Sequence, residues 1–213
     1  ISIKKISIKV RFRSKVIIFD MDRALINSTQ AICETINYMR LGLNLTPLSY
    51  SYIIEVINNP AKNYMIEFYG VDKISNNMMK IFEDEYQKNY FLHAKVYDEA
   101  MAVMKYCEDK NYAMAVASNA PNSSLEIILK NAKILDKFKM IIGASNKVPC
   151  KPAPNMLNLI MDSLGKQAIF IGDSYKDSMA AKNANIKYIN VTWGRDIQIL
   201  DEINCKTANE VIK

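Results

Sequence analysis

Short apolar runs alternate along the chain with stretches in which apolar residues recur every three or four positions. The runs, rich in β-branched residues, predict five strands, at 15–20, 112–118, 139–144, 168–173 and 187–193. The amphipathic stretches between them predict helices, at 98–110, 123–133, 155–165 and 178–185. Strands that alternate with helices in this way predict an α/β fold with a parallel sheet and right-handed helical crossovers. Because apolar residues are consecutive within the strands, we expect both faces of the sheet to be buried.

One interval breaks this alternation. About seventy residues separate the first strand from the helix that begins near Val96, and their pattern is helical throughout, at 28–43, 49–57, 60–70 and 76–92. We therefore expect an α/β core made of residues 1–24 and 93–213, with an inserted helical domain at 25–92. An insertion at this point lies over the carboxyl ends of the strands, where open α/β sheets bind ligands.

The insertion is rich in tyrosine and methionine. We expect these side chains, Tyr38, Tyr64, Met65 and Tyr86 among them, to pack its own core rather than to form a cofactor site. Arg40, Lys62 and several tyrosines are candidates for facing the cleft, and periodicity does not choose among them.

Length and composition agree with one domain that carries a smaller insertion. Half of the 213 residues are apolar, enough for a substantial core. The absence of a long apolar span and of a secretory signal favours a cytoplasmic protein without membrane contact. Cys33, Cys107, Cys150 and Cys205 are far apart in the sequence, so we expect reduced and mostly packed thiols.

Charge and histidine content narrow the possible chemistry. The net charge is +6, and the first fifteen residues hold six basic groups and no acid. Their alternating pattern is typical of an edge strand, and the rest of the chain lacks the basic stripe of a nucleic-acid-binding protein. The charge pattern therefore favours a small phosphorylated metabolite over nucleic acid as partner. We also predict no membrane contact, and a monomer or weak homodimer. His93 is the only histidine, so catalysis must rely on carboxylates and lysines.

Two carboxylates stand at the end of the first predicted strand. Asp20 and Asp22 are one residue apart, so both can face one crevice while Met21 points away. Such a pair suits a nucleophile and a proton shuttle, and its mutual repulsion favours a bound cation. The alternative is a loop with solvated aspartates and a helix cap at Asn27 or Ser28.

The ends of the next predicted strands carry polar residues as well. Ser118 and Asn119 stand where the second strand ends and a helix is expected to start, a position that suits phosphate oxygens but also ordinary turns. Lys151 precedes a proline-initiated helix and is interpreted either as a phosphate-neutralising ammonium or as a surface lysine. After the fourth strand, Gly172 allows a close approach, and Asp173 and Asp177 stand one helical turn apart.

Taken together, these motifs resemble those of the haloacid dehalogenase superfamily, in its phosphoglycolate phosphatase and β-phosphoglucomutase-like branch with a helical cap. The resemblance covers Lys15 to about Asp196 and is most specific in "KPAPNML" and in "GDSYKDSMAAKNA" followed by "VTWG". It implies a Rossmann-like parallel sheet core and a phosphatase. True dehalogenases of the superfamily lack the second aspartate, so Asp22 favours phosphate chemistry.

The resemblance also implies a role for each site residue. Asp20 would be the nucleophile and Asp22 the general acid and base, with phosphate contacts from Ser118, Asn119 and Lys151. It further implies Mg²⁺ held by Asp20, by the main-chain carbonyl of Asp22 and by Asp173, with Asp177 supporting these ligands.

The chain departs from the family pattern directly after the second aspartate, where Arg23 and Ala24 replace the usual Gly-Thr or Gly-Val. We expect Arg23 to face solvent and to reduce activity somewhat, rather than to bind a second anionic group of the substrate. Asn185 stands where the family favours glycine, and asparagine tolerates the left-handed conformation that this position needs. Besides the phosphatase, two other functions stay open: a phosphosugar mutase, and a weakly active or inactive binding protein.

Overall fold

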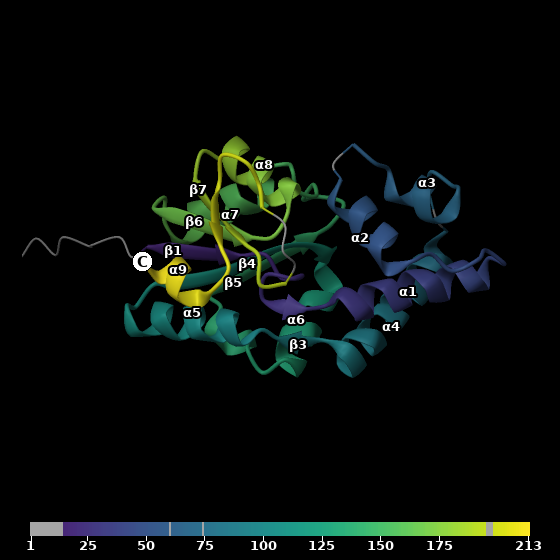
Figure 1. The fold of residues 1–213 in the computed structure, drawn as a ribbon, viewed down its shortest axis with the longest axis horizontal. Helices are drawn as coiled ribbons and strands as arrows, with labels where there is room; N and C mark the ends of the chain where they lie inside the picture. Colours follow the sequence, from purple (N-terminus) through teal and green to yellow (C-terminus); the bar gives the residue numbers. More distant parts are fainter. Residues whose placement is uncertain (1–14, 60, 74, 195–197) are drawn as a thin grey trace, which may run out of the picture.

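The computed structural model describes residues 15–59, 61–73, 75–194 and 198–213 (Figure 1). The predicted basic edge strand, apart from Lys15, lies outside these residues. The core is a parallel sheet in the order β5-β4-β1-β6-β7-β8. Its strands are β1 (Val16–Phe19), β4 (Ala113–Pro121), β5 (Met140–Ala144), β6 (Ala168–Gly172), β7 (Lys187–Val191) and β8 (Ile203–Cys205). The five predicted strands and the α/β parallel fold are confirmed, with β8 added at one edge.

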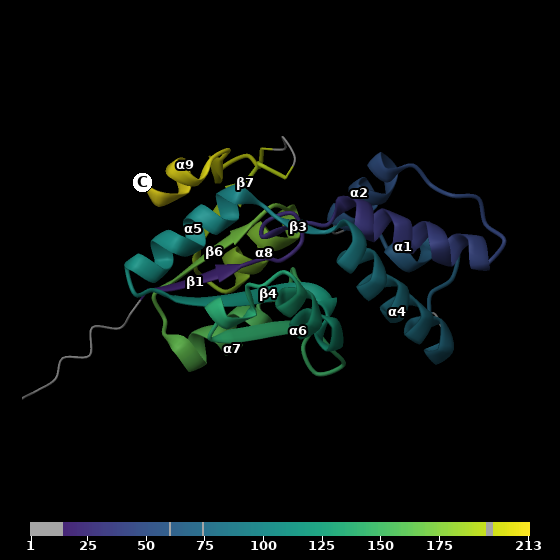
Figure 2. The ribbon, with the colours of Figure 1, turned by 90° about the horizontal axis from the view of Figure 1, so that it is seen from below.

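Helices cover both faces of the sheet (Figures 1 and 2). Ile17 and Phe19 of β1 pack toward α5 (Asp98–Asp109) and α6 (Asn122–Asn131), and α9 (Ala208–Ile212) lies against α5. Val16 and Ile18 face the opposite layer, α7 (Asn155–Leu164) and α8 (Tyr175–Asn183). Successive residues of β1 thus enter different cores, which explains why the strand is apolar at every position.

The insertion forms a helical group beyond the carboxyl ends of the strands (Figure 2). It contains α1 (Thr29–Gly42), α2 (Tyr50–Asn58), α3 (Tyr64–Tyr69) and α4 (Asn76–His93), with α1 packed along α4. The short strands β2 (Ile26–Asn27) and β3 (Lys95–Val96) pair antiparallel where the chain leaves and re-enters the core. The two connections to the insertion therefore run side by side.

Aromatic residues of the insertion divide between its interior and its surface. Tyr86 is buried, and Met65 packs against the same apolar cluster, as predicted. The prediction that Tyr38 and Tyr64 pack inside is wrong, because they are 48% and 41% exposed. Each stands beside a lysine ammonium, Lys88 for Tyr38 and Lys176 for Tyr64, so their ring faces are used in cation–π contacts.

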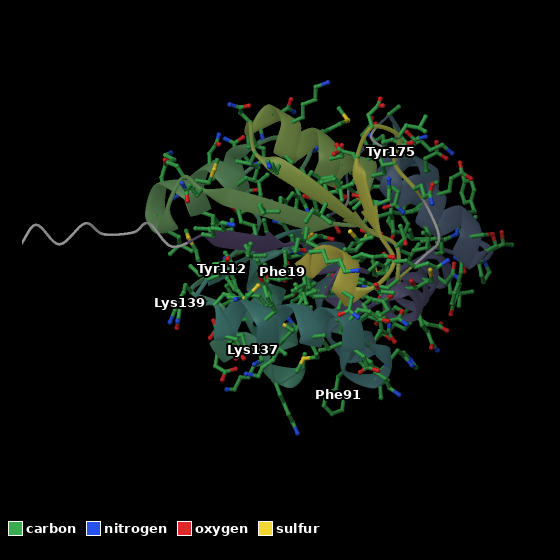
Figure 3. All side chains as sticks on the ribbon, turned by 60° about the vertical axis from the view of Figure 1, so that its left-hand side comes forward. Phe19, Phe91, Tyr112, Lys137, Lys139 and Tyr175 are labelled. Atoms are coloured by element: carbon green, nitrogen blue, oxygen red, sulfur yellow. The ribbon has the colours of Figure 1, made fainter. Side chains whose placement is uncertain are left out.

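Phe19 and Phe91 illustrate the two extremes of burial. Figure 3 shows Phe19 inside the core and Phe91 projecting outward. Phe19 packs edge-to-face on Phe138 with ring centroids 6.2 Å apart, whereas Phe91 is 73% exposed.

All four cysteines are free thiols, three of them buried, as predicted. Within the described part of the chain, we find no helix with the length and apolar character that crossing a membrane requires.

Candidate active site

The end of β1 brings Asp20 and Asp22 to the carboxyl edge of the sheet. The N–H of Asp20 donates to the carbonyl of Ile171 in β6 at 2.8 Å, which fixes the point where the strand ends. Met21 is fully buried and joins the apolar core, as the alternation predicts. Oδ1 of Asp22 is buried and has no hydrogen-bond partner among the described residues. A carboxylate oxygen in this condition is suited to accepting or delivering a proton.

Lys151 lies at the centre of the site. Its ammonium is 2.5 Å from Oδ1 of Asp20 and 2.6 Å from Oδ1 of Asp177, and it donates to the carbonyl of Ala117 at 2.9 Å. The residue is 4% exposed, so its interpretation as a surface lysine is wrong. Two hydrogen bonds, to Asp20 and to Ala117, and the ion pair with Asp177 explain how a charge is tolerated at this depth.

Asn119 holds the main chain of Lys151. Its side-chain oxygen accepts from the N–H of Lys151 at 2.7 Å, and its side-chain nitrogen donates to the carbonyl of Lys151 at 3.0 Å. Loop 145–154 is thereby tied to the end of β4, where the strand pairing shifts register between Ser118 and Pro121. Ser118 is fully buried, and its hydroxyl accepts from the N–H of Ala120, which leaves the hydroxyl proton for another acceptor.

The two carboxylate oxygens of Asp177 have different partners, one at the start of α8 and one at Lys151. Oδ2 accepts from the N–H of Ser174 at 3.2 Å and from the Ser174 hydroxyl at 2.6 Å, which completes a capping box at the start of α8. Oδ1 faces Lys151. A Cβ on Gly172 would lie 2.7 Å from Oδ2 of Asp177, so the close approach predicted for Gly172 is confirmed.

Arg23 is buried, not solvent-facing as predicted. It is 3% exposed; Nε lies 2.8 Å from Oδ2 of Asp173, and Nη2 donates to Oδ1 of Asn58 in α2 at 2.8 Å. Its φ of +61° is the left-handed conformation for which the family's glycine is suited. The prediction is wrong because two partners distant in the sequence provide acceptors for the guanidinium. Asn185, with φ of +55°, does adopt the left-handed conformation, as predicted.

Four carboxylates and two cations share this buried volume. Burial raises the pKa of Asp20 well above its ordinary value of 3.8, Lys151 opposes the increase, and the Asp177 carboxylate adds to it. Burial likewise raises the pKa of Asp22, while the charge of Arg23 lowers it. The carboxylates outnumber the cationic side chains, so a bound cation would reduce the repulsion among the carboxylates.

Three of the carboxylates lie close enough together to share a metal ion. One oxygen each from Asp20, Asp173 and Asp177 lies within 4.8 Å of the other two. An all-oxygen donor set of high charge suits a hard cation such as Mg²⁺. The side chain of Asp22 is outside this group. The residues present therefore fit the cation that the motifs imply.

Two polar residues of the insertion have different roles. Arg40, a candidate for facing the cleft, instead donates to the carbonyls of Thr46 and Phe68 within the insertion. Tyr64 does contact the α/β core domain, since the ammonium of Lys176 in α8 lies 5.5 Å from its ring centroid. Burial lowers the pKa of Lys176. Sequence reasoning missed Asn58 and Lys176, and the only signal for Lys176 was its position between Asp173 and Asp177.

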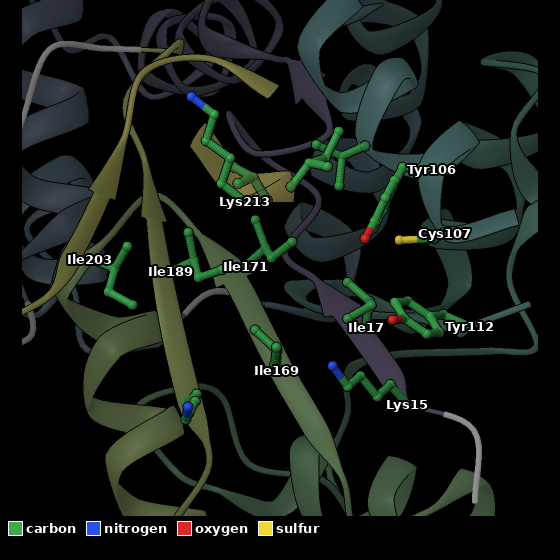
Figure 4. Close-up of a pocket in the computed structure, with 14 residues that line it drawn as sticks. Lys15, Ile17, Tyr106, Cys107, Tyr112, Ile169, Ile171, Ile189, Ile203 and Lys213 are labelled. Atoms are coloured by element: carbon green, nitrogen blue, oxygen red, sulfur yellow. The ribbon is translucent and has the colours of Figure 1, made fainter. Parts of the chain in front are cut away.

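A pocket of about 260 Å³ lies elsewhere, between the sheet, α5 and α9 (Figure 4). Ile17, Ile169, Ile189 and Tyr106 line it, and Lys15 and Lys213 stand at its edge. None of the candidate site residues contributes to it. The candidate active site is instead at the carboxyl ends of the strands, where the charged groups converge.

Comparison with known families agrees with this geometry. Residues 17–191 match the model of the haloacid dehalogenase-like hydrolases. The chain belongs to this family. The matched range contains all seven candidate site residues and the whole insertion, so the resemblance inferred from the motifs is confirmed.

Individual relatives indicate a phosphatase. A phosphoglycolate phosphatase of Pseudomonas fluorescens (strain Pf0-1) is 28% identical over 191 residues, with 84% of this chain and 70% of the relative covered. An N-acetylmuramic acid 6-phosphate phosphatase of Pseudomonas aeruginosa is 23% identical over 190 residues, with 86% and 84% covered. The fold is shared with a crystal structure described as a predicted phosphoglycolate phosphatase from Haemophilus somnus 129pt, at TM-score 0.76 and 22% identity, with 95% and 98% covered.

Proposed function

We propose that this chain is a Mg²⁺-dependent phosphatase that hydrolyses a small phosphorylated metabolite, of the sugar phosphate or phosphoglycolate type, through an aspartyl-phosphate on Asp20. The observation that carries the proposal is the position of Lys151, whose ammonium lies between Asp20 and Asp177. An ammonium at the nucleophile offsets the repulsion between a carboxylate and a phosphate dianion.

The first half of the reaction transfers the phosphoryl group to the protein. An oxygen of Asp20 attacks phosphorus, and the bond from phosphorus to the leaving oxygen breaks. Asp22 gives its proton to that oxygen, a role that its raised pKa favours because more of the acid form is present. The Ser118 hydroxyl would donate to a phosphoryl oxygen, and Lys151 would do so by exchanging one of its present acceptors for the phosphate. The side chain of Asn119 already holds Lys151, so its main contribution is to position that lysine.

The second half regenerates Asp20. Asp22, now ionised, takes a proton from water while the water oxygen attacks phosphorus, and the bond between phosphorus and Asp20 breaks to release inorganic phosphate. Mg²⁺, when bound by Asp20, Asp173, Asp177 and the main-chain carbonyl of Asp22, would supply charge neutralisation for the phosphoryl oxygens.

The insertion would act as a cap. We assign residues 25–92 to the cap and residues 1–24 and 93–213 to the catalytic core, with the paired β2 and β3 at the junction. Contacts across the junction, Tyr64 to Lys176 and Asn58 to Arg23, support a cap that approaches the site and selects the substrate. The four free thiols fit a reducing compartment such as the cytoplasm.

A phosphatase screen tests the proposal. Purified protein is assayed with Mg²⁺ against phosphoglycolate, sugar phosphates and nucleotides, with Asp20→Asn as the control. We expect phosphate release that requires Mg²⁺ and is lost in Asp20→Asn. Release that persists in Asp20→Asn contradicts the proposal. Phosphorus NMR of the products distinguishes hydrolysis from the isomerised sugar phosphate that a mutase would form.

A further inference from the structure

We propose that Arg23 is a positioning residue that latches the insertion to the candidate metal ligand Asp173, so that a divalent cation and the latch compete for that carboxylate. We define the latch as the contacts of Arg23 with Asp173 and Asn58. The inference rests on the proposed metal site, but on no particular substrate.

The latch is a direct bridge between the core and the insertion. Asp173 follows β6 of the core, Asn58 is the last residue of α2, and one guanidinium contacts both at 2.8 Å. Arg23 and Asp173 are almost completely buried, so water screens this ion pair only weakly. A second hydrogen bond fixes the orientation of the Asn58 amide, because its side-chain nitrogen donates to the carbonyl of Ile54. Displacement of the guanidinium therefore affects α2 directly.

The backbone beneath the guanidinium is held in place by its neighbours. The N–H of Arg23 donates to the carbonyl of Ile26 at 2.7 Å, and the Trp193 indole donates to the carbonyl of Ala24 at 3.0 Å. A Cβ on Gly194 would lie 2.5 Å from the carbonyl oxygen of Arg23, so the 193–194 loop packs tightly on this turn. Adjustment at Arg23 must then occur in the side chain.

Charge makes the cation and the guanidinium competitors. A divalent cation held by Asp20, Asp173 and Asp177 would add two positive charges beside a guanidinium that already contacts Asp173. Repulsion between them is large in a buried site. Nη1 of Arg23 is buried without a hydrogen-bond partner among the described residues, so the latched position leaves this nitrogen unsatisfied. We therefore expect cation binding to displace the guanidinium from Asp173 and to weaken its contact with Asn58.

The coupling between cation binding and the latch must act equally in both directions. If cation binding opposes the latch, removal of the latch must strengthen cation binding by the same factor. The insertion would be held against the core before the cation arrives and released when it binds. The paired β2 and β3 connections would persist in both states.

Direct cation binding tests the competition. Calorimetric titration with Mn²⁺, on the full chain without substrate, compares wild type with Arg23→Gly, which suits the positive φ. We expect about tenfold tighter binding in Arg23→Gly, within the usual range of coupling between sites. Asn58→Ala, which leaves every candidate ligand in place, should bind a few-fold tighter. Tyr64→Leu is the matched control, because it removes a contact between insertion and core that includes no carboxylate, and its affinity should equal that of wild type.

Hydrogen exchange tests whether cation binding loosens α2 of the insertion. In wild type, Mg²⁺ should increase amide exchange in α2, whereas in Asn58→Ala exchange should be high already and insensitive to Mg²⁺. Trp193, the only tryptophan of the chain, reports binding at the same turn by fluorescence. Equal Mn²⁺ affinity in wild type and Arg23→Gly, or Mg²⁺-independent exchange in wild-type α2, overturns the latch while the proposed function stands. If none of the proteins binds Mn²⁺, the proposed metal-dependent function fails together with the latch.

Discussion

The ammonium of Lys151 lies 2.5 Å from Oδ1 of Asp20, although the two residues are 131 positions apart in the sequence. Parallel strands explain the meeting, because β1 and β4 end at the same edge of the sheet and Asn119 ties Lys151 to the end of β4. Asp20, the ammonium and Asp177 therefore form one electrostatic unit, and removal of one member must affect the others.

Replacement of Lys151 by Met should abolish most of the activity. Asp20 and Asp177 would face each other without the ammonium, and the substrate phosphate would meet uncompensated negative charge. We expect kcat/KM to fall at least about 100-fold, as when a preorganised charge is removed from an active site. Lys147→Met, at an exposed lysine of the same loop, should match wild type. Comparable losses in both variants would argue against a specific role for Lys151.

Asn119→Ala should weaken catalysis through the position of Lys151. The variant removes both hydrogen bonds to the main chain of Lys151. We expect a loss of about 1–3 kcal/mol in the free energy of unfolding, measured in urea, and a fall in kcat. Asn146→Ala, at an exposed amide of the same loop, serves as the control. An unchanged kcat would show that Lys151 is held without Asn119.

Gly172→Ala should disturb Asp177. The new methyl group would lie within 2.8 Å of three side-chain atoms of Asp177, inside van der Waals contact. We expect a lower melting temperature and reduced phosphate release, because both the cap of α8 and the contact with Lys151 depend on Asp177. Gly42→Ala is the matched control, since nothing lies within 4 Å of its added Cβ. A melting temperature for Gly172→Ala equal to that of the control contradicts this packing.

Asp22→Asn should stabilise the protein in a pH-dependent way. Burial raises the pKa of Asp22 in the folded state above 3.8, so the folded protein binds this proton more tightly than the unfolded chain does. By linkage, ionisation of Asp22 lowers stability as the pH rises from about 3.8 through the folded-state pKa. In EDTA we expect a higher melting temperature for Asp22→Asn at pH 7, and a gain that shrinks as the pH is lowered toward 4. A gain independent of pH would mean that the stabilisation has another origin.

Much of the fold was predictable because its signals are local. Each predicted strand is an apolar run, and a polar residue that follows such a run must lie at the edge of the sheet; this places Asp20, Ser118 and Asp173 together. The two-residue strands β2 and β3 and the short β8 gave no comparable signal, because so few residues show no periodicity.

The mistakes in the site arose where partners are distant in the sequence. An arginine in a turn usually faces solvent, and the two acceptors that bury Arg23 are 35 and 150 positions away. Lys151 was open to two interpretations for the same reason, since its partners are Asp20 directly after β1, Ala117 of β4 and Asp177 of α8. Tyr64 was misplaced because the surface it faces, at Lys176, belongs to another element of the core. The burial and the partners of these three side chains depend on tertiary contacts, which the local sequence pattern does not reveal.

Chemical trapping of the phosphorylated nucleophile tests the central claim most directly. The enzyme is quenched during turnover of its best substrate and reduced with borohydride, which converts an acyl phosphate to the alcohol, and the peptide that contains residue 20 is analysed by mass spectrometry. The account predicts homoserine in place of Asp20, dependent on substrate. Steady turnover with Asp20 unmodified, or with the reduced residue at another carboxylate, would contradict it.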